Sequence, residues 1–150
     1  MYMSLYDKLS DISKVYREIE ETGITIYTYL KEKKLHDIQP LHVLQLKKTE
    51  ELKEKQQVFE QLLIQYCSDK NIEKPNVKQL FPYFTEQEAK QMQELLEETT
   101  QAERAAKQIS TKNQHYLQVL ITTTEAMVDC ISELNMERNH NSQMFMNELL

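Results

Sequence analysis

The chain opens with a seam of apolar residues that recur alternately four and three positions apart. The seam is interrupted only at Gly23, which has no side chain to contribute. Its members are Leu5, Leu9, Ile12, Tyr16, Ile19, Gly23, Ile26 and Leu30. This spacing predicts a helix over about residues 4–34 that turns one stripe toward a partner.

A second helical segment follows, with apolar ends and a charged middle. Pro40 fits only the first turn of a helix, so we expect this helix to span about residues 40–68. Within the charged middle, Leu52 is the clear core position, and pairs such as Glu51 with Lys55 are typical of a solvated face. The apolar ends comprise Leu41, Val43, Leu44, Leu46, Val58, Phe59, Leu62, Leu63 and Tyr66.

Residues 69–84 carry Pro75 and Pro82 and predict a connector with one helical turn around residues 77–81. Its apolar side chains are expected to pack the connector onto the end of the helices. These side chains are Leu80, Phe81, Tyr83 and Phe84.

Thr85 and Glu88 have the spacing of a capping box, in which each side chain accepts a hydrogen bond from the other's backbone amide. From there a four-three repeat continues without a break and predicts a third helix over about residues 85–135, roughly 75 Å long. Asn113 and Thr123 are polar positions in this seam, and a buried asparagine can fix the register between helices. The seam comprises Met92, Leu95, Thr99, Ala102, Ala106, Ile109, Asn113, Tyr116, Leu120, Thr123, Met127, Cys130 and Leu134.

The predicted fold class is therefore all-α, an antiparallel coiled-coil-like bundle of three long helices with an extended third helix. We expect a helical bundle over residues 1–135 and a separate C-terminal tail over residues 136–150. The tail ends in Met144, Phe145 and Met146, which suit either adaptable contact with a partner or docking back onto the bundle.

The third helix changes character after Asn113. Before this residue the row beside the seam is mostly polar, and after it the same row is apolar, so that the apolar face becomes too wide for one neighbouring helix to cover. We call the residues of this widened face the apolar strip. They are Tyr116, Leu117, Leu120, Ile121, Thr124, Met127, Val128 and Ile131.

The apolar strip predicts a site for a partner helix. The first two helices are each about 45 Å long, so the third would extend roughly 30 Å beyond them if all begin near one end. An exposed apolar face of this size is typical of a protein interface. The sequence leaves two alternatives open: a homodimer through the same strip, or burial of the strip on the first two helices as ordinary core.

Composition narrows the range of functions. The 150 residues fit one domain, and a single glycine with three prolines favours long helices over turn-rich folds. The formal charge is −6, from 24 acidic and 18 basic residues that are mixed along the chain. A mixed acidic chain predicts no binding to nucleic acid, which is held mainly through clustered Lys and Arg.

Candidate chemistry is sparse. Gly23 alone cannot build a phosphate-binding loop or a dinucleotide turn, which need several glycines. The histidines have no metal-ligand spacing, and the two cysteines are expected to be reduced core residues. We therefore predict no catalytic residues, no metal and no cofactor. The residues concerned are His36, His42, His115, His140, Cys67 and Cys130.

The sequence shows no signal-peptide pattern at its start and no run of about 18 apolar residues. We expect a cytoplasmic protein that does not insert into membranes.

The order of these features resembles the FlgN family of flagellar type III export chaperones. The resemblance covers about residues 5–134 and includes the charged centre of the second helix around residues 46–53. In the third helix, Ile109 stands for a family leucine and Asn113 for the second residue of an Asn-x-x-Asn pair. Ser110 replaces the first asparagine. Tyr116, Leu117 and Ile121 correspond to the leucine-rich run that follows.

The resemblance implies a chaperone that holds the C-terminal helical segments of the hook-filament junction proteins FlgK and FlgL and delivers them to the export gate. It places client binding on the distal third helix. It also implies a gate contact in the segment after that helix, where Phe145 is the candidate residue. The alternative function is a structural or adaptor coiled-coil protein that self-associates through the same strip.

Overall fold

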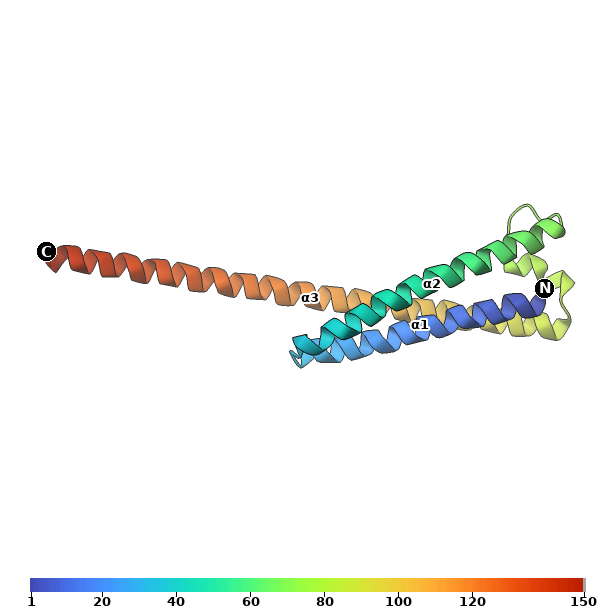
Figure 1. The fold of residues 1–150 in the computed structure, drawn as a ribbon, viewed down its shortest axis with the longest axis horizontal. Coiled ribbons are helices and arrows are strands. Elements are labelled where there is room, and N and C mark those ends of the chain that lie inside the picture. Colours follow the sequence, from blue (N-terminus) through green and yellow to red (C-terminus); the bar gives the residue numbers. More distant parts are fainter. Residues whose placement is uncertain (150) are drawn as a thin grey trace. The chain divides into compact units, whose positions relative to one another are not determined.

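The computed structural model describes the backbone of residues 1–149 and the side chains of residues 1–136 (Figure 1). The chain divides into two compact units, Met1–Asn113 and Gln114–Leu150. Within the described residues every regular element is helical, which confirms the predicted all-helical fold class. The elements are α1 (Tyr2–Lys31), α2 (Leu35–Asp69), the short 3-10 helix η1 (Val77–Tyr83) and α3 (Glu86–Leu149).

A tight turn joins α1 to α2. Lys33 takes the left-handed backbone conformation, with φ of 56°. Two backbone bonds close the helix end: Lys34 N–H donates to Tyr29 O at 2.9 Å and Lys33 N–H donates to Leu30 O at 3.2 Å. This is the Schellman pattern, which satisfies the last helical carbonyls and reverses the chain at once.

The predicted end of the first helix and the predicted start of the second are therefore corrected. α1 ends at Lys31, and α2 begins at Leu35 with Pro40 inside it. The turn has already reversed the chain by Lys34, so α2 can start before the proline. Pro40 is the sixth residue of α2, beyond the first turn, so its missing N–H removes one intrahelical bond, the one to the carbonyl of His36. Asp37 in the first turn favours the helix start through its negative charge.

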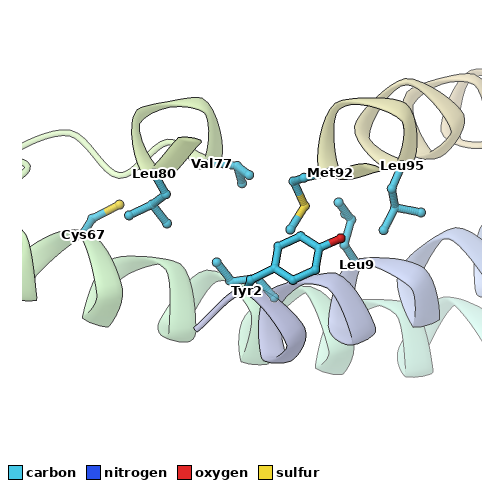
Figure 2. Packing of buried hydrophobic residues seen from close by; sticks show 8 residues of the cluster. Tyr2, Leu9, Cys67, Val77, Leu80, Met92 and Leu95 are labelled. Atoms are coloured by element: carbon cyan, nitrogen blue, oxygen red, sulfur yellow. The ribbon is translucent and has the colours of Figure 1, made fainter. Parts of the chain in front are cut away.

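The first core cluster joins all four elements of the first unit (Figure 2). Leu5 from α1, Leu80 from η1 and Met92 from α3 are each 0% exposed. Tyr2 O–H donates to Gln91 Oε1 at 2.9 Å, which ties the start of α1 to α3. The cluster comprises Tyr2, Leu5, Leu9, Cys67, Val77, Leu80, Met92 and Leu95.

A second core cluster continues along the same helices. Leu52 is the α2 member, as predicted for its charged middle. Tyr16 buries its ring in this cluster, and its oxygen accepts a hydrogen bond of 2.8 Å from Gln56 Nε2. The remaining members are Ile12, Val15, Ile19, Ala102 and Ala106. All eight positions of the predicted α1 seam are buried, so the four-three spacing identified the packed face of α1 correctly.

The connector between α2 and α3 is held at both ends. Asn71 takes the left-handed conformation (φ 57°), and Ile72 N–H donates to Cys67 O at 2.9 Å, which closes α2 with a second Schellman turn. Phe81 and Phe84 pack against the first core cluster, as expected. The prediction for Tyr83 is wrong, because its side chain is 49% exposed and lies under the Lys70 amino group.

The capping box at the start of α3 is confirmed. Thr85 N–H donates to Glu88 Oε2 at 2.9 Å, and Glu88 N–H donates to Thr85 Oγ1 at 3.2 Å. Both bonds satisfy amide groups that the first turn of a helix leaves without intrahelical acceptors.

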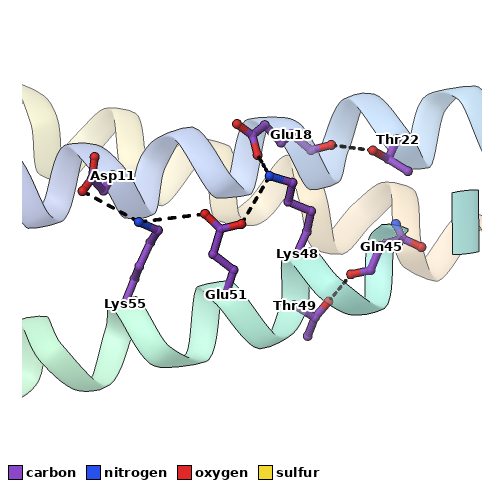
Figure 3. A network of polar contacts seen from close by, with 8 residues as sticks. All are labelled: Asp11, Glu18, Thr22, Gln45, Lys48, Thr49, Glu51 and Lys55. Carbon is purple, nitrogen blue, oxygen red and sulfur yellow. Dashed lines mark hydrogen bonds and ion pairs between the residues drawn. The ribbon is translucent and has the colours of Figure 1, made fainter. Parts of the chain in front are cut away.

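Charged side chains pair α1 with α2 in antiparallel order (Figure 3). Lys48 contacts both Glu18 and Glu51, and Lys55 lies between Glu51 and Asp11. The middle of α2 was predicted to be a solvated face in preference to a binding patch, and in the structure part of its charge pairs with α1. Alternating signs favour the observed register over a shifted one, which would oppose like charges.

The pKa of the Lys48 amino group is raised, first by its hydrogen bond to Glu18 and then by that to Glu51. A raised lysine pKa means that the folded chain holds this proton more tightly than the unfolded chain does. The contribution to stability is therefore present below about pH 10 and is lost as the pH rises through the raised value.

Three helices meet at Gly23. A Cβ atom added at this glycine would lie 2.7 Å from Ile109 Cγ2 on α3 and 3.6 Å from Gln45 Nε2 on α2. One turn further along α3, Asn113 Nδ2 donates to Gly23 O at 2.9 Å, and its side chain is buried. At the gap in the α1 seam, α3 thus lies close enough to leave no room for a side chain, and the buried asparagine bonds to the same residue.

We expect Gly23→Ala to destabilise the first unit by about 1 kcal/mol, although alanine improves helix propensity by nearly that amount. Ile109 Cγ2 is fixed to a β-branched carbon and cannot move aside without an unfavourable χ1 rotation. In an Ile109→Ala background the obstacle is gone, and the same change should become stabilising. Chemical denaturation of the four proteins of this double-mutant cycle measures the sign, and stabilisation by Gly23→Ala alone would contradict the close contact.

The third helix continues to Leu149 and does not end near residue 135 as predicted. After Pro82 the sequence contains no further proline or glycine, and extending a helix is favourable once it has formed. The boundary between compact units also lies after Asn113, not after residue 135. That residues 136–150 act as a separate tail stays a prediction.

Candidate partner-binding face

The seam of α3 changes from buried to exposed between Asn113 and Thr123. From Met92 to Asn113 its members are buried or half-buried, whereas from Ile121 to Met136 every side chain is exposed. Periodicity placed an apolar face on both stretches, and members of the first stretch belong to the two core clusters of the first unit.

The apolar strip lies entirely in the second unit. Leu117 and Ile121 are 44% and 50% exposed, and Val128 and Ile131 are 54% and 56% exposed. An aliphatic side chain of this exposure keeps about half of its contact with water, which is unfavourable unless another surface covers it. Met127 is 62% exposed and adds a flexible, polarisable side chain to the same face.

Thr124 contributes to this face as an apolar group. Its hydroxyl donates to Leu120 O at 2.8 Å, one turn earlier in the helix. With the hydroxyl engaged by the backbone, the methyl group is what the residue offers to a partner. Tyr116 and Leu120 complete the strip and are half-buried.

Three further exposed apolar residues lie close to the strip, and sequence reasoning missed two of them, Val119 and Met136. Val119, Leu134 and Met136 are 50%, 63% and 72% exposed. Leu134 was assigned to the seam, and Val119 stands on the other side of the seam from the apolar row. The exposed apolar surface is therefore wider than two rows. A count of apolar residues around the whole helix, in place of one row beside the seam, would have found Val119.

A second set of exposed apolar residues lies on the first third of α2. Val43, Leu44 and Leu46 were predicted at the apolar start of this helix, and they are 46%, 41% and 55% exposed. The side of α2 that is less exposed here carries Gln45, and polar side chains continue along it through Thr49. Apolar composition without a matching four-three seam therefore failed to identify core residues in this segment.

The two cysteines differ. Cys67 is buried in the first core cluster, as predicted. Cys130 is exposed, so its assignment to a core is wrong. The four-three seam counted Cys130 as inward-facing, but at this position of α3 the seam itself is exposed.

Among the described residues, no group of three or more His, Cys, Asp and Glu side chains is placed to hold a metal ion. In the same part of the chain, no helix is both long and apolar enough to cross a lipid bilayer. The tail residues Met144, Phe145 and Met146 lie outside the part of the chain whose side chains the structure describes.

Comparison with known proteins finds no relative of this chain. The chain matches no family model, no curated protein and no solved structure.

Proposed function

We propose that this chain is a cytoplasmic export chaperone of the flagellar type III system, similar to the FlgN family, and that it is not an enzyme. In this proposal the helices form an antiparallel, coiled-coil-like bundle of three long helices. The client is a helical segment of the hook-filament junction proteins FlgK and FlgL. The chaperone carries this segment to the export gate, and the residues after the strip make the gate contact.

One observation carries the proposal: the apolar strip is exposed on a regular helix. Its members Leu117, Ile121, Thr124, Val128 and Ile131 are exposed and recur at alternating four- and three-residue spacing, which is the pattern of a helix face that packs against another helix. Covering such a strip with an amphipathic client helix removes apolar surface from water on both partners.

The test replaces two strip residues by aspartate in one protein, Ile121→Asp with Val128→Asp. Capture of the purified C-terminal helical segment of FlgK or FlgL is expected to weaken by roughly thirtyfold or more, because both side chains lose apolar contact and a charge enters the interface. Isothermal titration calorimetry measures the affinity, and far-UV circular dichroism checks that the helical signal is retained.

The matched control puts the same charges on the polar side of the same helix, with His115→Asp and Thr122→Asp, which stand seven residues apart as Ile121 and Val128 do. Both residues are exposed and lie outside the strip. This control should capture the client as well as the original chain does. Undiminished capture by the strip variant would refute the site. A tight dimer of the free chain in light scattering, without client capture, would favour the structural coiled-coil alternative.

A further inference from the structure

The segment that carries the apolar strip contains a row of acidic residues. Glu125, Asp129 and Glu133 follow one another at four-residue spacing, so each lies about one helical turn beyond the last and about 40° further around the helix. The row therefore crosses the face opposite the strip: Glu125 lies at one border of the strip, and Glu133 lies one turn after the seam residue Cys130, on the other side. Glu125 is one turn from both Ile121 and Val128, which places its carboxylate beside the strip. All three acidic side chains are exposed.

No basic residue of the segment compensates this row. Between Lys112 and Arg138 the sequence contains neither lysine nor arginine, so no cation stands three or four residues from any of the three carboxylates. In the first unit, acidic side chains do have basic partners: Lys48 contacts Glu18, and Lys107 contacts Glu103 one turn away. Like charges at four-residue spacing destabilise an isolated helix, and here nothing within the segment offsets that repulsion.

We infer that the occupant of the apolar strip is an amphipathic helix whose apolar face is bordered by lysine or arginine. This inference rests on the proposed function and specifies the client's chemistry. Basic residues beside the apolar face of a client helix would lie opposite Glu125 on one side and Glu133 on the other, as charged residues do at the flanks of paired helices. The apolar contact supplies affinity, and the charges select the client and its orientation.

The same row disfavours a second copy of this chain as the occupant. A copy paired through residues 114–136 brings three more carboxylates and no cation, whether the two helices run parallel or antiparallel. The client helix, in contrast, is free to carry the opposite charge. The exposed strip therefore combines an attraction for basic helices with a bias against self-pairing.

Two synthetic helical peptides test the inference with the full chain. They share one Leu/Ile face and differ only in its borders, which carry lysine in one peptide and glutamate in the other. Fluorescence anisotropy at low salt is expected to give about tenfold tighter binding of the lysine-bordered peptide, and the difference should shrink once the ionic strength reaches roughly 0.5 M. The triple variant Glu125→Lys, Asp129→Lys, Glu133→Lys should reverse the preference.

A control variant tests whether the peptide preference comes from the acidic row or from the net negative charge of the chain. Glu54→Lys, Glu60→Lys and Glu94→Lys change the net charge by the same amount at exposed positions of the first unit. This control should keep the original preference for the lysine-bordered peptide. If the control loses the preference as the triple variant does, the selectivity comes from net charge and the inference is overturned.

The remaining outcomes distinguish this inference from the proposed function. Equal binding of both peptides by the original chain overturns the basic-border inference and leaves a purely apolar client site intact. Binding of neither peptide, together with capture of the FlgK or FlgL segment, also overturns the inference alone. Failure to capture that segment overturns the proposed function itself.

Discussion

Replacing Leu5 by alanine is expected to lower the free energy of unfolding by about 3 kcal/mol, which is a large part of the stability of a small domain. Leu5 is 0% exposed and lies in the cluster that joins α1, α2, η1 and α3. Truncation removes its buried methyl groups from that cluster and leaves a cavity that the surrounding helices fill only in part. The midpoint of thermal unfolding should fall by roughly 10 °C.

Met3→Ala is the matched control for this experiment. Met3 stands two positions earlier on the same helix and is 62% exposed. Its truncation should change the free energy of unfolding by less than about 0.5 kcal/mol. Guanidinium denaturation followed by circular dichroism measures both variants. Equal losses in the two would mean that the start of α1 is not packed as described.

The four-three spacing predicted the packed face of α1 and of the first part of α3 because apolar side chains four and three positions apart lie on one face of a helix, and that face packs where a neighbouring helix is present. Met92 and Leu95 on α3, and Leu9 on α1, lie where that spacing puts them. The Thr85–Glu88 capping box was predictable for a different reason: both bonds form between residues three apart, so no distant part of the chain is needed.

The spacing could not show whether a seam is covered. Leu134 and Cys130 continue the seam of Met92 and are nevertheless exposed. Whether a seam is covered depends on where other helices end. α1 ends at a turn in which Lys33 takes the left-handed conformation, a position where glycine is the usual residue. A lysine in this conformation is uncommon, and nothing in the local sequence indicated it.

For the candidate site, sequence placed the widening of the apolar face at Asn113. The structure divides the chain into its two units after that same residue. Residues Leu117 and Ile121 of the strip are exposed. The identity of the partner does not follow from periodicity, because any amphipathic helix satisfies an apolar stripe. The acidic row that begins at Glu125 limits the choice of partner helices to those with basic residues, and it is found only when the charges around the strip are examined as well as its apolar residues.

The buried asparagine on α3 offers the most specific test of how the first unit is held in register. Asn113 is 8% exposed, its Nδ2 donates to Gly23 O, and its Oδ1 accepts no hydrogen bond from any described residue. Asn113→Asp keeps the shape of the side chain but replaces the donor by an oxygen. A buried carboxylate would then face the glycine carbonyl without a partner. We expect a loss of about 3 kcal/mol at neutral pH.

The pH dependence identifies the cause of that loss. Burial disfavours the charged carboxylate, so the folded variant holds its proton up to a higher pH than the unfolded chain, which releases it near pH ~4. Relative to the original chain, the deficit is therefore smallest below about pH 4, grows as the pH rises toward the folded-state pKa, and is complete above it. The protonated acid can also donate to Gly23 O in place of the lost amide.

Asn113→Leu is the control, since it removes the donor and the unsatisfied Oδ1 together and leaves an apolar side chain of similar length. Its effect should stay within about 1 kcal/mol and should not depend on pH, because no ionisable group is introduced. Urea denaturation of the three proteins near neutral pH and near pH ~4 measures both differences. A loss for Asn113→Asp that is small, or unchanged between the two conditions, would mean that Asn113 is not buried against Gly23 and that the register of α1 and α3 is fixed elsewhere.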